Sequence, residues 1–149
     1  MSTAGLGPSG RLVLDANPLI AVDRERLRPL QRLLRDAARN GRLAVPSLVI
    51  RRLGMYKGKR KWAASFVQRF RSEIETTLQL DDEFILFAEK QRLHPELAND
   101  DVQSLVIAKV RTWPLVTHEQ PMLRAAAQQQ VQCINNLEEL RRVLEGKML

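Results

Sequence analysis

The sequence predicts an α/β protein built around a parallel sheet, and two observations support this. Four short apolar runs each have the length of one buried strand, and the segments between them carry apolar residues at helical spacing. Strands and helices that alternate along a chain form a parallel sheet with helices on both faces, because β-α-β crossovers are right-handed. We therefore expect a three-layer α/β/α fold with a central, mostly parallel sheet of four to five strands.

The first strand and helix are predicted within residues 11–40. Residues 11–14 form an apolar run that is typical of a buried strand, and a turn is expected at residues 15–18 because Asn and Pro follow the acid. Apolar residues then recur at helical spacing from Asp23, a plausible N-cap, to Asn40, which stands before a glycine. This segment predicts one strand that leads into one amphipathic helix.

The next elements are predicted within residues 43–80. A second strand is expected at residues 43–45, and Ser47 is expected to cap a short helix that ends near Leu53. Beyond a basic loop, a helix is indicated by aromatic residues whose spacing places them on one face, and we expect this face in the core. These residues are Trp62, Phe66 and Phe70. Residues 77–80 are a further candidate strand.

The second half of the chain continues the alternation. Asp81 or Asp82 is expected to cap a helix over residues 83–91, and the helix over residues 102–110 is apolar on most sides, which predicts a central, buried position. The remaining predictions are a strand at 115–117, a helix that begins at Pro121, a strand at 131–134 and a helix at 137–144. Asn136 and Glu139 have the spacing of a capping box, which is typical of the start of this last helix.

The length and composition predict a single domain. The chain has 149 residues, of which 44% are hydrophobic and 28% are charged, as in one ordinary globular domain. Residues 1–10 are small and polar, so we expect a flexible leader followed by one domain over residues 11–149. No apolar run approaches the ~20 residues of a membrane-spanning helix, and no signal peptide is recognised, so a cytoplasmic protein without membrane association is expected.

Charge and cysteine content indicate which ligands to consider. The chain carries 24 Lys and Arg against 17 Asp and Glu, a formal net charge of +7, which favours a nucleic acid as partner. The single cysteine, Cys133, cannot form an intrachain disulfide and has no partner at zinc spacing. We expect it to be a buried strand residue.

Acidic residues stand where the predicted parallel sheet would bind a ligand, at the carboxyl ends of its strands. Asp15 follows the first strand, Asp100 and Asp101 begin the buried helix, and Glu119 follows the strand at 115–117. Carboxylates that meet closely repel one another unless cations neutralise them, and oxygen ligands suit Mg²⁺ or Mn²⁺. The pattern predicts a divalent metal site that activates water against a phosphodiester.

Each acid also has a purely structural explanation. Asp100 and Asp101 could be present because an acid at a helix start is favoured by capping and by the helix dipole. Glu119 taken alone could be an ordinary surface residue. Asp15 is the least easily explained by structure, because any polar residue could have ended its strand.

Motifs along most of the chain resemble the PIN domain family, which includes VapC-type toxins and the PIN domains of RNA-decay factors. Each motif is weak alone, and their order and spacing carry the resemblance. They are the strand Leu12–Asn17, the strand and helix Val45–Leu53 with Lys57, the acids after Asn99, the segment Leu115–Glu119 with Leu123, and the closing strand and helix Val131–Leu140.

The resemblance implies an active site with roles for particular residues. Asp15, Asp101 and Glu119 would be the catalytic metal ligands for Mg²⁺ or Mn²⁺, with Asp100 as the alternative to Asp101. Asn17 and Thr117 would be supporting residues that orient the carboxylates. The match is incomplete, because Arg51 and Arg52 stand where the family usually has a glutamate, and Glu119 stands where an aspartate is commoner. A guanidinium there would compete with metal, and Glu73 or Glu75 could replace the missing acid.

A basic segment with aromatic neighbours predicts RNA contacts. Its residues Lys57, Lys59, Arg60 and Lys61 could follow a phosphate backbone, with Arg52 nearby, while Tyr56 stacks on a base. A solvated loop is the structural alternative for the segment. A solvated helix residue is the alternative for Arg52.

The function that these residues predict is metal-dependent cleavage of single-stranded RNA, by an endoribonuclease acting alone or as the toxin of a toxin-antitoxin pair. The rival hypothesis is a catalytically degenerate PIN-like module that binds RNA or a protein partner without cleavage, which Arg51 and Arg52 favour. A response-regulator-like or other flavodoxin-type domain is a third class, but this chain lacks the lysine near the last strand that would complete that pattern. The partners expected are RNA, an antitoxin or other protein, and a second copy in a homodimer.

Overall fold

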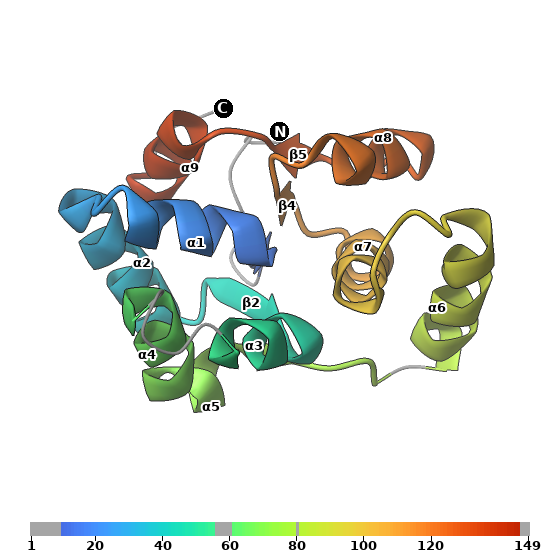
Figure 1. Cartoon of the computed structure of the whole chain (residues 1–149), viewed down its shortest axis with the longest axis horizontal. Coiled ribbons are helices and arrows are strands. Elements are labelled where there is room, and N and C mark those ends of the chain that lie inside the picture. The colour runs from blue at the N-terminus through green and yellow to red at the C-terminus, as the bar shows by residue number, and fades with distance from the viewer. Residues whose placement is uncertain (1–9, 56–60, 80, 147–149) are drawn as a thin grey trace.

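Five parallel strands form the central sheet of the computed structural model, which describes residues 10–55, 61–79 and 81–146 (Figure 1). The strands are β1 (Leu12–Leu14), β2 (Leu43–Pro46), β3 (Glu75–Thr76), β4 (Leu115–Val116) and β5 (Cys133–Ile134). Their order across the sheet is β3-β2-β1-β4-β5, and every neighbouring pair is parallel. The predicted three-layer α/β/α fold with a parallel sheet is confirmed.

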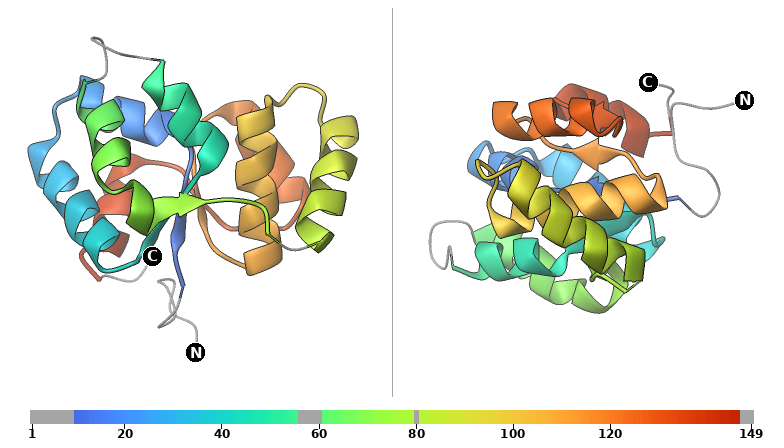
Figure 2. Two further views of the ribbon diagram at one scale, coloured as in Figure 1. Left: turned by 90° about the horizontal axis from the view of Figure 1, so that it is seen from below. Right: turned by 90° about the vertical axis from the view of Figure 1, so that its right-hand side faces the viewer.

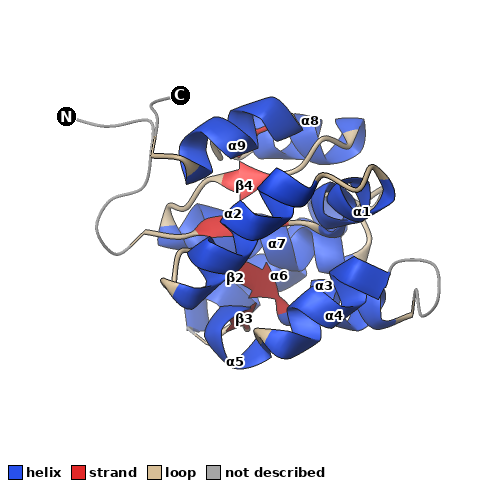
Figure 3. Ribbon diagram, turned by 90° about the vertical axis from the view of Figure 1, so that its left-hand side faces the viewer, coloured by secondary structure: helices blue, strands red, loops and turns tan. Residues whose placement is uncertain are grey.

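The helices lie on the two faces of this sheet. Those described are α1 (Ala16–Arg24), α2 (Arg28–Arg39), α3 (Ser47–Gly54), α4 (Lys61–Arg69), α5 (Arg71–Ile74), α6 (Asp81–Leu93), α7 (Asn99–Arg111), α8 (Gln120–Gln128) and α9 (Leu137–Leu144). One face is covered by α1 to α5 and α9, and Figure 3 is seen from that side. The other face is covered by α7 and α8, and α6 packs outside α7 (Figure 2).

The strand residues alternate between two apolar clusters. Leu12 and Leu14 pack with the helices of one face, and Val13 and Ala44 pack with those of the other. All four side chains are fully buried. Burial on both faces explains why the sequence of β1 is uniformly apolar and shows no polar alternation.

The predicted turn at residues 15–18 is wrong, because this segment is the start of α1. Asp15 is the N-cap residue, and its Oδ1 accepts a hydrogen bond from the Ala16 N–H at 2.9 Å. The predicted helix over residues 23–40 is two helices, which separate at Arg26 with a φ of 53°. Pro29 fits the second position of α2, where a helix leaves backbone N–H groups unpaired in any case.

Two smaller predictions also need correction. The aromatic helix is divided at Phe70 into α4 and α5. Trp62 stacks on Phe66, and Phe66 meets Phe70 at a tilted angle. Phe66 and Phe70 belong to the core as expected, and the partly buried Trp62 packs against it. The candidate strand at residues 77–80 is instead β3, two residues earlier, which pairs with Val45 and Pro46.

Cys133 lies in β5 as predicted, but its side chain is only half-buried. Burial raises the pKa of the thiol to about 11, so the group stays protonated near neutral pH. Among the described helices, none has both the length and the apolar character needed to cross a membrane. The leader predicted at residues 1–10 lies outside the described residues except for Gly10, and it stays a prediction.

Candidate metal centre

The candidate site lies at the carboxyl edge of the sheet between β1 and β4, where the strand order reverses. Asp15 follows β1, and its N–H donates to the Val116 carbonyl at 3.1 Å. Thr117 follows β4, and its N–H donates to the Ile134 carbonyl at 3.1 Å. These hydrogen bonds continue the ladders beyond the strands and fix both residues at the sheet edge.

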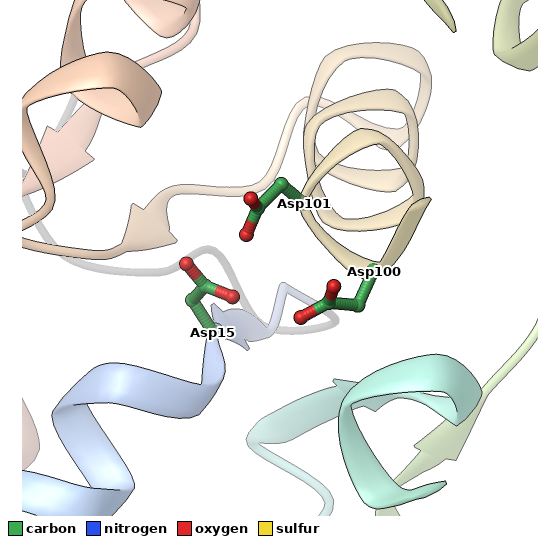
Figure 4. Close-up of side chains that lie close together, drawn as sticks. All are labelled: Asp15, Asp100 and Asp101. Atoms are coloured by element: carbon green, nitrogen blue, oxygen red, sulfur yellow. The ribbon is translucent and has the colours of Figure 1, made fainter. Parts of the chain in front are cut away.

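Three carboxyl groups converge at this edge: those of Asp15, Asp100 and Asp101 (Figure 4). One oxygen from each lies within 4.8 Å of the others. Asp15 comes from the end of β1, and the other two come from the first turn of α7. Two of the three remote segments that were expected to meet therefore do so, the end of β1 and the start of α7, whereas the segment of Glu119 is not part of this group.

Asp15 is a buried carboxyl group held by two hydrogen bonds. It has no exposed surface, and its Oδ2 accepts from the Thr117 hydroxyl at 3.1 Å while Oδ1 accepts from the Ala16 N–H. Burial, followed by the neighbouring Asp101 charge, raises the pKa of Asp15 to about 7. Thr117 therefore contacts the acid that it was predicted to orient.

Asp101 has one oxygen engaged and one buried oxygen without a partner. Its Oδ2 accepts from the Ala98 N–H at 3.2 Å, which is the half of a capping box that the third helical residue supplies; Ala98 has no side-chain oxygen to supply the other half. Its Oδ1 is buried and has no hydrogen-bond partner among the described residues. Burial raises the pKa of Asp101 to about 6, with smaller contributions from the charges of Asp100 and Glu119. The hydrogen bond from the Ala98 N–H acts in the opposite direction.

The structure places the other predicted site residues less closely. Glu119 is the half-buried N-cap residue of α8 and affects Asp101 through its charge, but it is not one of the three converging acids. Asn17 is half-buried in the first turn of α1 and makes no side-chain hydrogen bond to another described residue. Their roles stay predictions.

Arg52 contacts the site directly. Its Nη1 donates to Asp100 Oδ2 at 3.0 Å, and the two side chains are 33% and 11% exposed. Arg52 also lowers the pKa of Asp101, against the larger opposite effects. The explanation of Arg52 as a solvated helix residue does not hold.

The candidate replacement acids do not join the site. Glu75 is bound by Arg71, whose Nε donates at 3.0 Å, and Glu73 accepts from the Ser72 hydroxyl on the exposed surface. Neither belongs to the converging group. Of the predicted RNA contacts, Lys57, Lys59 and Arg60 lie outside the described residues, and so does Tyr56; only the backbone of Lys61, at the start of α4, is described.

Gln103 has a positioning role that the sequence did not reveal. Its Oε1 accepts from the Leu48 N–H at 2.9 Å, and its Nε2 donates to the Ser47 hydroxyl at 3.0 Å. The predicted cap of α3 by Ser47 is therefore wrong, because Ser47 is the first helical residue and the cap comes from α7. The signal in the sequence was a glutamine, next to Ser104, in the mostly apolar stretch 102–108.

The donor set fits a hard divalent cation. Carboxylate oxygens are the ligands that Mg²⁺ and Mn²⁺ prefer, and the buried, unpartnered Oδ1 of Asp101 is a position that a cation would satisfy. Burial is the main cause of the raised pKa values of Asp15 and Asp101, and the neighbouring carboxylates add to it; a bound cation would oppose both effects.

Fold and site together define an α/β protein with an acidic centre at the carboxyl edge of its sheet. PAE2754 from Pyrobaculum aerophilum is similar over 93% of this chain and 98% of that chain, with a TM-score of 0.56 and 19% identity. VapBC2 from Rickettsia felis, bound to a DNA fragment from its promoter, is similar over 85% of this chain and 98% of that chain, with a TM-score of 0.59 and 16% identity. Neither a family model nor a curated protein matches the chain. The chain has the PIN-like fold that its motifs predicted.

Proposed function

We propose that the protein is a metal-dependent endoribonuclease that cleaves single-stranded RNA. The observation that carries the proposal is the meeting of Asp15, Asp100 and Asp101 within 4.8 Å at the edge where the strand order reverses. The net charge of +7 supports a polyanionic substrate.

Mg²⁺ or Mn²⁺ would be held by Asp15 and Asp101, with Asp100 or Glu119 completing the set. When bound, the cation supplies a Lewis acid that lowers the pKa of water and offsets charge on a phosphodiester. Thr117 keeps Asp15 Oδ2 in place through its hydroxyl, and the Ala98 N–H does the same for Asp101 Oδ2. Ordered carboxylates lose little entropy on binding, which favours a well-formed site.

The substrate-binding part of the proposal concerns the basic segment. Lys57, Lys59, Arg60 and Lys61 would follow the RNA backbone, and Asn17 would help to orient the acids. The likeness to VapBC2 supports a narrower proposal, in which the protein is the toxin of a cytoplasmic toxin-antitoxin pair and binds an antitoxin.

A second candidate is a PIN-like module that binds RNA or a protein partner without cleavage. The Arg52–Asp100 ion pair favours it, because a guanidinium neutralises one of the three converging acids and competes with a cation for its oxygens.

Cleavage of a fluorescent single-stranded RNA in Mn²⁺ separates the two candidates. The nuclease proposal expects cleavage by the wild-type protein, loss of cleavage in Asp15→Asn and Asp101→Asn, and normal cleavage in Asp36→Asn, a surface variant of the same chemistry. All proteins are purified identically, and chelation of the metal must stop the reaction. Binding without cleavage in every variant would support the module, and cleavage that survives Asp15→Asn would refute the proposed site.

A further inference from the structure

Arg52 is placed at the site by two helices that contact each other in a fixed register. On α7, Asp100 and Gln103 are three residues apart and share one face of the helix. On α3, the contact at Leu48 is made by its backbone N–H in the first turn, and Arg52 lies about one turn further along the helix. The Leu48 N–H donates to Gln103 Oε1 at 2.9 Å, and Arg52 Nη1 donates to Asp100 Oδ2 at 3.0 Å.

Because of this register, the packing of α3 against α7 fixes the position of the Arg52–Asp100 contact. A single exposed ion pair would carry little weight, because such pairs form and break at small cost. Here Asp100 is 11% exposed, and Gln103 holds the N-terminus of α3 through two hydrogen bonds. The packing of the two helices therefore positions Arg52 beside the acids.

The charge balance of the acids indicates what the arginine does. Asp15, Asp100 and Asp101 carry one negative charge each when ionised, and Arg52 offsets the charge of Asp100. The charge that remains on the three converging acids matches one divalent cation. A guanidinium also has five N–H donors in a planar fork, so one group can serve a carboxylate and a phosphate together.

We propose that Arg52 is a resident second cation of the site, which holds Asp100, limits the converging acids to one divalent ion and contacts a phosphate of the bound RNA. This inference rests on the proposed function, because it assumes that the acids hold a metal and that the ligand is a nucleic acid. It makes Arg52 a phosphate-binding residue of a one-metal centre.

Binding of Mn²⁺ alone tests the first part, by electron paramagnetic resonance of the free ion. The wild-type protein should bind one ion per chain. Arg52→Glu replaces a positive charge with a carboxylate and should bind Mn²⁺ about tenfold more tightly, a difference of ~1.4 kcal/mol, and take up a second ion. Arg51→Ala, an exposed neighbour on the same helix, should behave as wild type. Unchanged Mn²⁺ binding in Arg52→Glu would overturn the proposal.

Binding of adenosine monophosphate in Mn²⁺ tests the second part by calorimetry, since this nucleotide has no internucleotide bond to cleave. Arg52→Ala should lose about tenfold in nucleotide affinity, as expected for one charge-assisted contact. Arg52→Lys should recover part of the loss, and Arg51→Ala should change the affinity less than twofold. Equal affinities in Arg52→Ala and Arg51→Ala would overturn the proposal, as would weaker Mn²⁺ binding in Arg52→Ala, which would assign Arg52 a structural role.

The two proposals fail in different ways. If RNA is cleaved but the Arg52 variants bind Mn²⁺ and nucleotide as Arg51→Ala does, only the role of Arg52 is refuted. If Mn²⁺ and nucleotide bind as expected but RNA is not cleaved, only the nuclease activity is refuted. If the wild-type protein binds no Mn²⁺, both are refuted.

Discussion

Asp15 destabilises the fold that positions it. The residue has no exposed surface, and burial and Asp101 raise its pKa to about 7, well above the ordinary value of 3.8. A carboxyl group whose pKa is raised by folding binds its proton more tightly in the folded state than in the unfolded state. The contribution of Asp15 to stability is therefore fully present below about pH 4, falls as the pH rises, and is lost above about pH 7, where the group is ionised in both states.

We expect Asp15→Asn to raise the melting temperature in metal-free buffer above pH 7. The amide removes the charge but keeps the size, so the expected gain is on the order of a few kcal/mol for a shift of this size. Thermal unfolding followed by circular dichroism between pH 4 and pH 8 measures the effect. The wild-type stability should fall across this range, and the variant should show a shallower slope.

Asp36→Asn is the control for this comparison, because the Asp36 side chain is 67% exposed. Its pH dependence should match that of the wild type. A loss of stability in Asp15→Asn at pH 8 would show that the hydrogen bonds of the carboxylate outweigh its burial and its repulsion by Asp101.

Glu83 is a buried carboxylate with the opposite character. It has no exposed surface, but Arg111 donates to both of its oxygens at 2.7 and 2.9 Å, and the Gln79 N–H donates at 2.8 Å. Its charge is matched within hydrogen-bond distance, whereas Asp15 faces other acids. Burial alone therefore does not distinguish a functional carboxylate from a structural one; the neighbouring charges do.

At the scale of the elements, the Glu83–Arg111 ion pair joins α6 to the C-terminal end of α7, and its loss should destabilise the protein. Glu83→Gln leaves the part-buried Arg111 guanidinium without its countercharge, and we expect a loss of about 3 kcal/mol in the free energy of unfolding. Urea denaturation measures it. Asp82→Asn, exposed on the same helix, should change stability by less than about 0.5 kcal/mol. Equal stability of the two variants would contradict the expected role of the pair.

The contact between α3 and α7 depends on Gln103. We expect Gln103→Ala to lower the free energy of unfolding by about 1–2 kcal/mol, because the Leu48 N–H loses its acceptor at a part-buried helix start. It should also weaken Mn²⁺-dependent nucleotide binding, since Arg52 would lose its alignment with Asp100. Gln128→Ala, an exposed residue of α8, is the control and should affect neither measurement. A stable Gln103→Ala protein would mean that apolar packing alone holds the two helices.

At the scale of the whole molecule, metal binding should be visible as stability. A ligand that binds only the folded state adds about 2.7 kcal/mol at a concentration one hundred times its Kd. We expect Mn²⁺ to raise the melting temperature of the wild-type protein, and to raise it more at pH 8 than at pH 5.5, because protons on Asp15 and Asp101 compete with the cation. Asp101→Asn should lose most of this gain. A rise that is equal in this variant would locate the metal elsewhere.

The sequence predicted the elements well where local spacing sets them and poorly where it does not. Apolar runs of strand length correctly indicated β1, β2, β4 and β5, and helical spacing indicated most of the helices. The break at Arg26 and the start of α1 directly after Asp15 were missed, because the same residues are compatible with a turn and with a helix start until packing decides between them.

The sequence alone determined that this chain alternates strands with helices and carries acids after its strands, since both properties follow from residue spacing along the chain. Tertiary structure alone decided that Asp15 is held by a threonine 102 residues away and that Asp100 is paired with an arginine 48 residues away. No local pattern records such pairs, because strand order and helix packing bring remote residues together. A parallel sheet joins distant segments at one edge, and there the charges of this site meet.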